Sequence, residues 1–343
     1  MPASTHAHAK LPGVLYARTA SGIELPILDV SHPVFQVTQS DEALHAEANA
    51  WAAGQARTGF VGRLFNRYAL PRLLKRSRIG RGLLAADGGH LDGLTTYLLK
   101  LGPQALHSAD FNDMDRRISG SIAGTLLRVR ARDMAEAQAR QLLPLLLPDP
   151  ARPLHLVNIA GGPASDSLNC LRILAADPKH PLAQRPIRIH LLDLSTEGPQ
   201  FAAASLAVWM GEEGALKRLD LQMELKAYDW THAESRYPQL AAVPSDALVL
   251  VSSEGGLFDY ADDGVVLANL KAIRENTPGD GLVFGTINLP EGPGKAVRQG
   301  SKAALHPRTL ADVATVAGIG GWEMRESWER PAGAGFCLGK AAA

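Results

Sequence analysis

The stretch LHLVNIAGGPASDSLN, residues 154–169, decides the fold. Its apolar run 154–159 contains β-branched residues and is typical of a buried strand. Gly161 and Gly162 end this run, and the segment that follows Pro163 has the alanine, serine and aspartate content of a helix start. A strand, a glycine turn and a helix in this order are typical of the ligand-binding turn of a doubly wound sheet, although a glycine pair alone also fits a simple tight turn.

Apolar runs and helical stretches alternate after the proline-rich linker 147–153. This alternation predicts βαβ units and a mostly parallel sheet. Two short runs at the end of the chain are joined by a short link that contains PAGA, which favours an antiparallel hairpin. After the strand at 154–159, we expect strands over 187–194, 221–230, 247–253, 281–289, 321–328 and 335–340.

The N-terminal part has a different pattern. Residues 13–37 read as extended edge segments, because Pro26 and Pro33 interrupt them. Ser40 is a suitable N-cap, with two acidic residues in the turn after it. We expect helices from Ser40 onward, over 90–101 and over 119–143, the last ending at Pro144.

A basic stretch, residues 57–81, carries eight basic residues and no acidic one. The simpler interpretation is a helix that packs one face on the core and exposes a cationic face to solvent. A contact with phosphate groups, a membrane surface or nucleic acid is the alternative.

The composition of the 343 residues excludes several classes of protein. Lys plus Arg and Asp plus Glu both number 35, so the chain has no overall preference for nucleic acid or membranes. Cys170 and Cys337 lie far apart and outside any zinc-binding spacing, so we predict no metal site and no disulfide framework. The N-terminal residues lack a signal-like apolar run, and no stretch is long enough to span a membrane. We therefore expect a cytoplasmic protein.

Acidic and aromatic residues follow the second and third strands of the predicted sheet. Asp193 ends the strand 187–194, where a carboxylate can accept hydrogen bonds from both hydroxyls of a ribose. Asp229 and Trp230 follow the next strand, and they could bind the amino group and cover the face of a purine. Each acid taken singly could equally cap a helix. Together these residues predict a nucleoside site at the carboxyl edge of the sheet.

These motifs give the chain a family resemblance. Residues ~120–343 resemble the class I S-adenosylmethionine-dependent methyltransferases in IAGG, HLLDLS, AYDW, SSEGGLFDY, TPGDGLVFGTINL and HPRTLADVATVAGIGGWEMRE. The resemblance implies an α/β fold with a Rossmann-like, mostly parallel seven-stranded sheet and a terminal antiparallel hairpin, preceded by a mostly α-helical domain. We divide the chain into an N-terminal cover, dimerisation or substrate domain, 1–118, and a methyltransferase domain, 119–343.

The resemblance also implies a cofactor, S-adenosylmethionine, and residues that bind it. Gly161 and Gly162 would approach its methionine part, Asp193 its ribose, and Asp229 with Trp230 its adenine. The neighbouring positions Ala160, Leu194, Ser195 and Ser253 belong to the same predicted set. GGPASD is not the GxGxxG turn that a pyrophosphate needs, which disfavours a nicotinamide dehydrogenase.

The chain departs from the family pattern in two places. Asn158 stands where the family has an acidic residue, and residues 163–165 replace the third glycine. Asp166 could supply the missing carboxylate to the methionine ammonium, or it could cap its helix. In some relatives an arginine on the helix before the first strand reaches the cofactor carboxylate, and Arg130 is our candidate.

Catalytic candidates should follow the fourth and fifth strands and face the methyl group. Methyl transfer from a sulfonium needs alignment and exclusion of water, and a base only where the acceptor carries a proton. We select His306, Glu254 and Tyr260; His306 has a side chain that titrates near neutrality, although a role at the helix entry is the alternative. The glycine-rich stretch 292–300 suggests a mobile loop over the pocket.

The N-terminal domain would cover the site and help to form the acceptor pocket. Its candidate lining residues are Tyr97, His107, Asp110, Arg116 and Arg117. By analogy with related enzymes, it could also pair two subunits into a homodimer.

The leading functional hypothesis is methyl transfer to a small-molecule acceptor, at oxygen or nitrogen, in secondary metabolism. The alternatives are a methyltransferase that acts on RNA, protein or lipid, and a catalytically silent scaffold that binds an adenosyl ligand.

Overall fold

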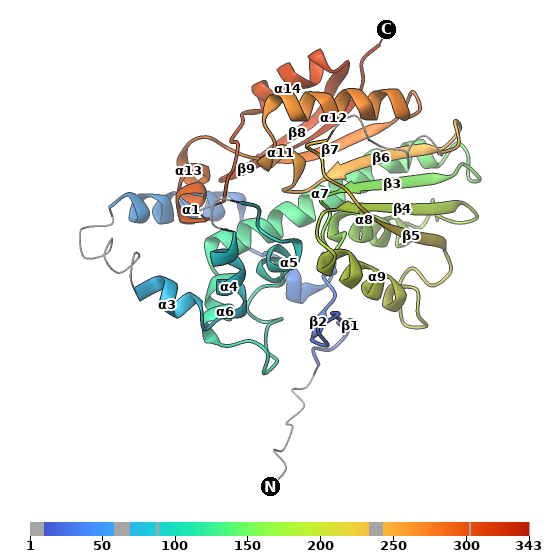
Figure 1. The fold of residues 1–343 in the computed structure, drawn as a ribbon. Helices are drawn as coiled ribbons and strands as arrows, with labels where there is room; N and C mark the ends of the chain where they lie inside the picture. Colours follow the sequence, from blue (N-terminus) through green and yellow to red (C-terminus); the bar gives the residue numbers. More distant parts are fainter. Residues whose placement is uncertain (1–9, 58–68, 87–88, 233–242, 302, 343) are drawn as a thin grey trace.

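The computed structural model of the chain describes residues 10–57, 69–86, 89–232, 243–301 and 303–342. Its main feature is one seven-stranded sheet with the order β5-β4-β3-β6-β7-β9-β8 (Figure 1). The strands are β3 (Leu154–Ile159), β4 (Pro186–Asp193), β5 (Asp220–Ala227), β6 (Leu248–Ser253), β7 (Leu282–Asn288), β8 (Trp322–Arg330) and β9 (Gly333–Lys340).

The strand directions confirm the predicted mostly parallel sheet. Strands β5, β4, β3, β6 and β7 are parallel to one another, and β9 inserts antiparallel between β7 and β8. The chain order reverses at β3, so the loops after β3 and β6 diverge there and leave a crevice at the carboxyl edge. The glycine turn follows β3 and therefore stands at this crevice.

Side chains of β3 alternate between two apolar cores, as the period of a strand requires. Leu154 and Leu156 belong to a core that also contains residues of α7 and α8. Val157 and Ile159 point the other way, into a core shared with α12 and α14. The helices involved are α7 (Ile122–Leu146), α8 (Ser165–Ala175), α9 (Glu197–Trp209), α12 (Asp263–Asn276) and α14 (Leu310–Ile319).

The N-terminal elements lie beside the sheet (Figure 1). They are β1 (Tyr16–Arg18), β2 (Glu24–Pro26), η1 (Pro33–Phe35), α1 (Asp41–Ala56), α3 (Leu70–Leu74), α4 (Arg78–Ala85), α5 (Gly93–Leu101) and α6 (Asp113–Ser119). The short helix α11 (Leu257–Tyr260) and α13 (Gly292–Ser301) complete the described elements.

The N-terminal elements share their apolar core with the sheet. Leu25 and Tyr97 belong to the same cluster of buried residues as Leu154. The Tyr97 hydroxyl donates a hydrogen bond to the carbonyl of Pro26 at 2.7 Å and accepts one from the backbone N–H of Leu28 at 2.8 Å. Asn169 on α8 ties the same segment to the sheet layer, because its amide donates to the Leu28 carbonyl at 2.9 Å. The apolar core is therefore continuous across the predicted boundary at 118–119.

Two expected elements differ from those observed. Helix α7 continues through Pro144 to Leu146, because Pro144 is exposed in the last turn and its missing N–H removes a single helical bond. The stretch 292–300 forms helix α13, which contacts α1, in place of a loop. Arg298 stabilises this helix by donating hydrogen bonds to two backbone carbonyls that precede it.

Part of the basic stretch 57–81 lies outside the described residues, at 58–68. Its described remainder forms α3 and α4. Every helix in the described parts of the chain is too short or too polar to cross a membrane.

Candidate functional site

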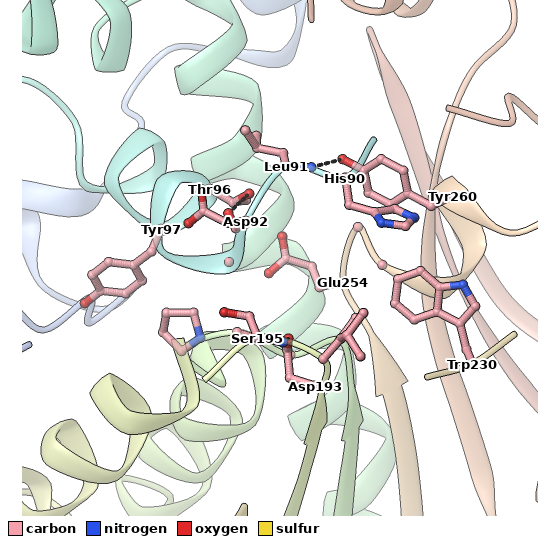
Figure 2. Close-up of a pocket in the computed structure, with 18 of the residues that line it drawn as sticks. His90, Leu91, Asp92, Thr96, Tyr97, Asp193, Ser195, Trp230, Glu254 and Tyr260 are labelled. Atoms are coloured by element: carbon pink, nitrogen blue, oxygen red, sulfur yellow. Dashed lines mark hydrogen bonds between the residues drawn. The ribbon is translucent and has the colours of Figure 1, made fainter. Parts of the chain in front are cut away.

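A cavity of about 480 Å³ lies at the carboxyl edge of the sheet, between α5 and the loops after β3, β4, β5 and β6. Figure 2 shows Asp193, Glu254 and Trp230 around this space, with Tyr97 and Tyr260 on opposite sides of the view. The predicted residues that line the cavity are Ala160, Gly161, Gly162, Asp193, Leu194, Ser195, Asp229, Trp230, Glu254 and Tyr260.

The glycine turn forms one wall of the cavity with bare backbone. Gly162 has a φ of 49°, and a Cβ atom there would lie 2.9 Å from the Cα of Gly93 on α5. A Cβ on Gly161 would overlap the side-chain oxygen of Asn158 beneath the turn. The turn therefore requires glycine at both positions to approach α5 and the cavity so closely.

Asp193 lies at the end of β4 and is held by the backbone. Its two carboxylate oxygens accept hydrogen bonds from the N–H groups of Gly162 and Ser195, each at 2.8 Å. Burial raises the pKa of Asp193, although these N–H groups favour its charged form. Because each oxygen has two lone pairs, the carboxylate can still accept hydrogen bonds from a ligand in the cavity.

An aromatic wall closes the side of the cavity next to β5 and β6. The ring of His90 contacts Trp230 edge to face at a centroid distance of 5.3 Å, and Tyr260 at 4.8 Å. Asp229 precedes this wall, and hydrogen bonds from the side chain and backbone of Thr231 lower its pKa. The wall offers a flat apolar surface beside an ionised carboxylate, which suits a purine.

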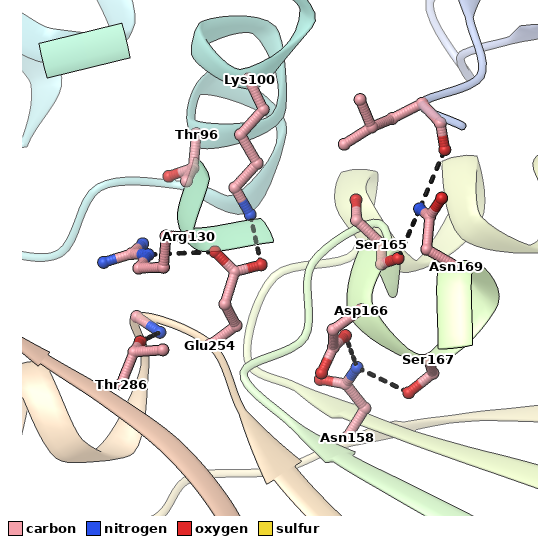
Figure 3. A network of polar contacts seen from close by, with 12 residues as sticks. Thr96, Lys100, Arg130, Asn158, Ser165, Asp166, Ser167, Asn169, Glu254 and Thr286 are labelled. Carbon is pink, nitrogen blue, oxygen red and sulfur yellow. Dashed lines mark hydrogen bonds and ion pairs between the residues drawn. The ribbon is translucent and has the colours of Figure 1, made fainter. Parts of the chain in front are cut away.

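A paired group of charges surrounds Glu254, which lies in the loop after β6 (Figure 3). The Glu254 carboxylate accepts a hydrogen bond from the Lys100 ammonium at 2.7 Å and one from Arg130 Nε at 3.1 Å. Arg130 also contacts Asp259 at 3.4 Å. Lys100 and Glu254 are 7% and 6% exposed and both line the cavity, so it presents a positive and a negative charge side by side.

Three residues of the predicted cofactor set lie beneath the cavity surface. Asn158 and Asp166 are buried and bonded to each other, and Asn158 also donates to the Ser167 hydroxyl. The Ser253 hydroxyl donates to the Ile159 carbonyl at 2.9 Å and accepts from the N–H of Leu257 at 2.9 Å. These side chains hold the strand ends in place instead of facing the cavity.

Arg130 and His306 also lie outside the lining of this cavity. Arg130 is turned toward Glu254 and Asp259, which explains why it does not point into the space. His306 is exposed, and its backbone N–H donates to the carbonyl of Asp259 at 2.7 Å. His306 therefore lies on the segment that leads into α14 and outside this cavity, and its role as a base stays a prediction.

Several lining residues were missed by the sequence reasoning. They come from α5 and the segment just before it: His90, Leu91, Asp92, Gly93, Thr96 and Lys100. Asp92 is the N-cap of α5 and accepts a hydrogen bond from the N–H of Thr95 at 2.8 Å. An Asp before GLTTY therefore indicates where the helix begins, but it does not indicate that the helix lies over the cavity. Of the lining candidates in the N-terminal domain, Tyr97 lines the cavity, whereas His107, Asp110, Arg116 and Arg117 do not.

Comparison with known proteins gives no matching family model and no matching curated sequence. Among solved structures, a possible exported protein from Bordetella parapertussis is similar over 89% of this chain and 98% of its own, with 18% identity and a TM-score of 0.58. The mitomycin 7-O-methyltransferase MmcR matches over 88% of this chain and 76% of its own, with 16% identity and a TM-score of 0.43. The pyocyanin biosynthetic protein PhzM matches over 64% and 58%, with 20% identity and a TM-score of 0.39.

The strand order and the antiparallel insertion of β9 decide the fold. The chain has a Rossmann-like α/β fold with one antiparallel strand inserted at one edge of the parallel strands. The likeness to the Bordetella structure extends over both the N-terminal elements and the sheet, so this arrangement of the two parts is not peculiar to one chain. In a doubly wound sheet, the crevice where the loops after β3 and β6 diverge is the expected ligand site, and the 480 Å³ cavity lies there.

Proposed function

We propose that this protein is an S-adenosylmethionine-dependent methyltransferase that acts on a small-molecule acceptor. One observation carries the proposal: the turn after β3, Asp193 after β4 and Trp230 after β5 line one cavity. A glycine turn, a ribose-binding carboxylate and an aromatic surface from three successive strands are what an adenosyl group requires.

The residues of the cavity fit the cofactor without phosphate-binding groups. The turn at Gly161 and Gly162 presents bare backbone to the cavity, because a side chain at either position would clash with neighbouring protein atoms. The Asp193 carboxylate would bind the ribose hydroxyls, and the wall of Trp230 and His90 would cover the adenine. The cofactor supplies an activated methyl group on a positively charged sulfur.

We further propose that Lys100 and Glu254 hold the amino-acid end of the cofactor. That end carries an ammonium and a carboxylate, which require charges of both signs. The paired side chains of Lys100 and Glu254 supply them at the cavity surface, whereas Asp166 and Arg130 lie behind it. This assignment explains why Asn158 can stand where the family has an acidic residue, because Glu254 in the loop after β6 would supply the carboxylate instead.

The chain's own contribution to the reaction is alignment and exclusion of water. Helix α5 covers the cavity and lies against the glycine turn, so the site is closed on that side. Burial raises the pKa of Tyr260, so its hydroxyl keeps its proton at neutral pH and positions groups instead of acting as a base. The two Glu254 oxygens accept hydrogen bonds from Lys100 and Arg130. Glu254 therefore serves as a binding group for positive charge and not as a general base.

The cytoplasmic location and the homodimer stay predictions from the sequence. Cys170 and Cys337 are buried free thiols, as a reducing compartment requires. The division into domains 1–118 and 119–343, and the setting in secondary metabolism, are proposed on the resemblance.

Binding of S-adenosylhomocysteine tests the proposed function. At about one hundred times its dissociation constant, the ligand should raise the melting temperature by roughly 5 °C. Asp193→Ala should lose most of this shift, because the ribose loses its partner. The control Asp246→Ala removes an exposed carboxylate near the opposite end of β6 and should keep the shift. If the wild type gives no shift with the ligand, the proposed function is wrong.

A further inference from the structure

A second cavity, of about 300 Å³, adjoins the first. Leu91, Thr96, Gly255 and Tyr260 line both cavities, so these residues form the boundary between them. The first cavity has the features that fit an adenosyl group. The second lies on the other side of Tyr260, where a methyl acceptor would meet the cofactor's reactive end.

The walls of the second cavity are largely apolar and come from both parts of the chain. Helices α1, α4, α5 and α7 supply one side, and α13 and the segment after it supply the other. Trp51 on α1 adds a flat aromatic surface. The larger aliphatic side chains are those of Leu83, Leu91, Leu99, Ile118, Leu127, Val297 and Leu305. A volume of this size at such walls suits one compact organic molecule with apolar rings.

The charged groups of this cavity lie next to Tyr260, and their charges are already paired. Arg130 and Asp259 are the charged residues among those that line it. Arg130 contacts Glu254 at 3.1 Å and Asp259 at 3.4 Å. The second oxygen of Asp259 accepts the backbone N–H of Asn288 at 2.8 Å. A charged acceptor would therefore lose its hydration at these described walls without gaining an opposite charge.

We propose that the second cavity binds the methyl acceptor and selects an uncharged, largely apolar ring compound with a hydroxyl group. This inference rests on the proposed function and adds the substrate class. The hydroxyl lies toward Tyr260 and Gly255, and the rings lie among the leucines and Trp51. In the transfer, a lone pair of the acceptor oxygen forms the new C–O bond. The electrons of the broken methyl–sulfur bond remain on sulfur, and the hydroxyl proton goes to water.

Calorimetry with two matched probes tests the class of ligand. With S-adenosylhomocysteine bound, 1-naphthol should bind one to one, and 1-naphthoate should bind at least about tenfold more weakly because its charge must be desolvated. Saturation with S-adenosylhomocysteine should not weaken 1-naphthol binding, because the two ligands occupy different cavities. Competition between them, equal binding of 1-naphthoate, or no binding of 1-naphthol at about 1 mM would overturn the inference.

Substitutions in the second cavity test whether 1-naphthol binds there. Ala123 on α7 lines the space, and Ala123→Phe should fill it and weaken 1-naphthol at least about tenfold while S-adenosylhomocysteine binds as before. The control Ala46→Phe makes the same change on the exposed face of α1 and should alter neither ligand. Trp51→Ala should also weaken 1-naphthol, and it serves if Ala123→Phe does not fold. Unchanged 1-naphthol binding in the filled variant would refute the placement, whereas failure of the wild type to bind S-adenosylhomocysteine would refute the proposed function itself.

Discussion

At the scale of single residues, the glycine turn is the most demanding part of the site. Gly161→Ala would place a methyl group against Asn158 and Leu191. We expect it to lower the free energy of unfolding by about 1–3 kcal/mol and to weaken S-adenosylhomocysteine binding. Chemical denaturation and calorimetry would measure the two effects.

Gly318 provides the matched control for this substitution. It lies in helix α14, and nothing is within 4 Å of the position that a Cβ would take. Gly318→Ala should stabilise the protein by about 0.5–1 kcal/mol, because alanine favours a helix more than glycine does. Equal effects of the two substitutions would contradict the account of the turn.

A buried histidine pair on β3 and β4 predicts a loss of stability in acid. The rings of His155 and His190 stack at 5.2 Å, with Nδ1 and Nε2 3.0 Å apart. Burial, and then the neighbouring His190, lower the pKa of His155 to about 4, and burial lowers the pKa of His190. In the unfolded chain both histidines bind a proton near pH 6.5, whereas in the folded state they bind it only at lower pH. The folded state is therefore progressively destabilised as pH falls from about 6.5 toward 4.

Melting temperatures at pH 7 and pH 5 would measure this effect. The wild type should melt at a lower temperature at pH 5, and His155→Gln should show a smaller difference between the two pH values. His45→Gln changes an exposed histidine on α1 and should leave the difference as in the wild type. If His155→Gln kept the full difference, the histidine pair would not be its source.

At the scale of elements, the ion pair between Lys100 and Glu254 joins α5 to the loop after β6. Both side chains are buried, so Lys100→Met leaves the Glu254 carboxylate with Arg130 alone. We expect a loss of about 3–5 kcal/mol in the free energy of unfolding. Lys10→Met, which breaks the more exposed pair with Glu24, should cost at most about 1 kcal/mol. Similar losses in the free energy of unfolding for both variants would show that burial does not determine how much the Lys100–Glu254 pair contributes to stability.

Substitution of Lys100 tests which end of the cofactor this lysine binds. Lys100→Met should weaken S-adenosylhomocysteine but change 5′-methylthioadenosine little, because the latter lacks the amino-acid end. Calorimetry with both ligands gives the comparison, under conditions where the variant is folded. Equal weakening of both would mean that Lys100 does not contact the amino-acid end.

The sequence predicted the elements of the sheet better than the partners of its side chains. The period of β3 and the glycines after it placed the cavity correctly, because strand ends in this fold have fixed neighbours. The sequence could not indicate that His306 and Arg130 lie outside the cavity lining, because a helix entry and an internal ion pair leave no periodic trace in it. His90 and Lys100 were missed for a related reason, since only tertiary packing brings α5 over the turn.

At the scale of the whole molecule, one apolar core joins the N-terminal elements to the sheet. We therefore expect a single cooperative unfolding transition. Tryptophan fluorescence and far-ultraviolet circular dichroism should give coincident urea curves, and a fragment of residues 119–343 should not fold alone, because it would expose this core. Two separate transitions would show that the N-terminal part is an independent unit.

The central claim is that the loops after three neighbouring strands bind one adenosyl group. A crystal structure of the full chain with S-adenosylhomocysteine tests it most directly. We predict density for the ligand in the 480 Å³ cavity, with the ribose hydroxyls about 2.6–3.2 Å from the Asp193 carboxylate and the adenine against Trp230. Density for the ligand at another place, with Asp193 and Trp230 free of contact, would contradict the claim.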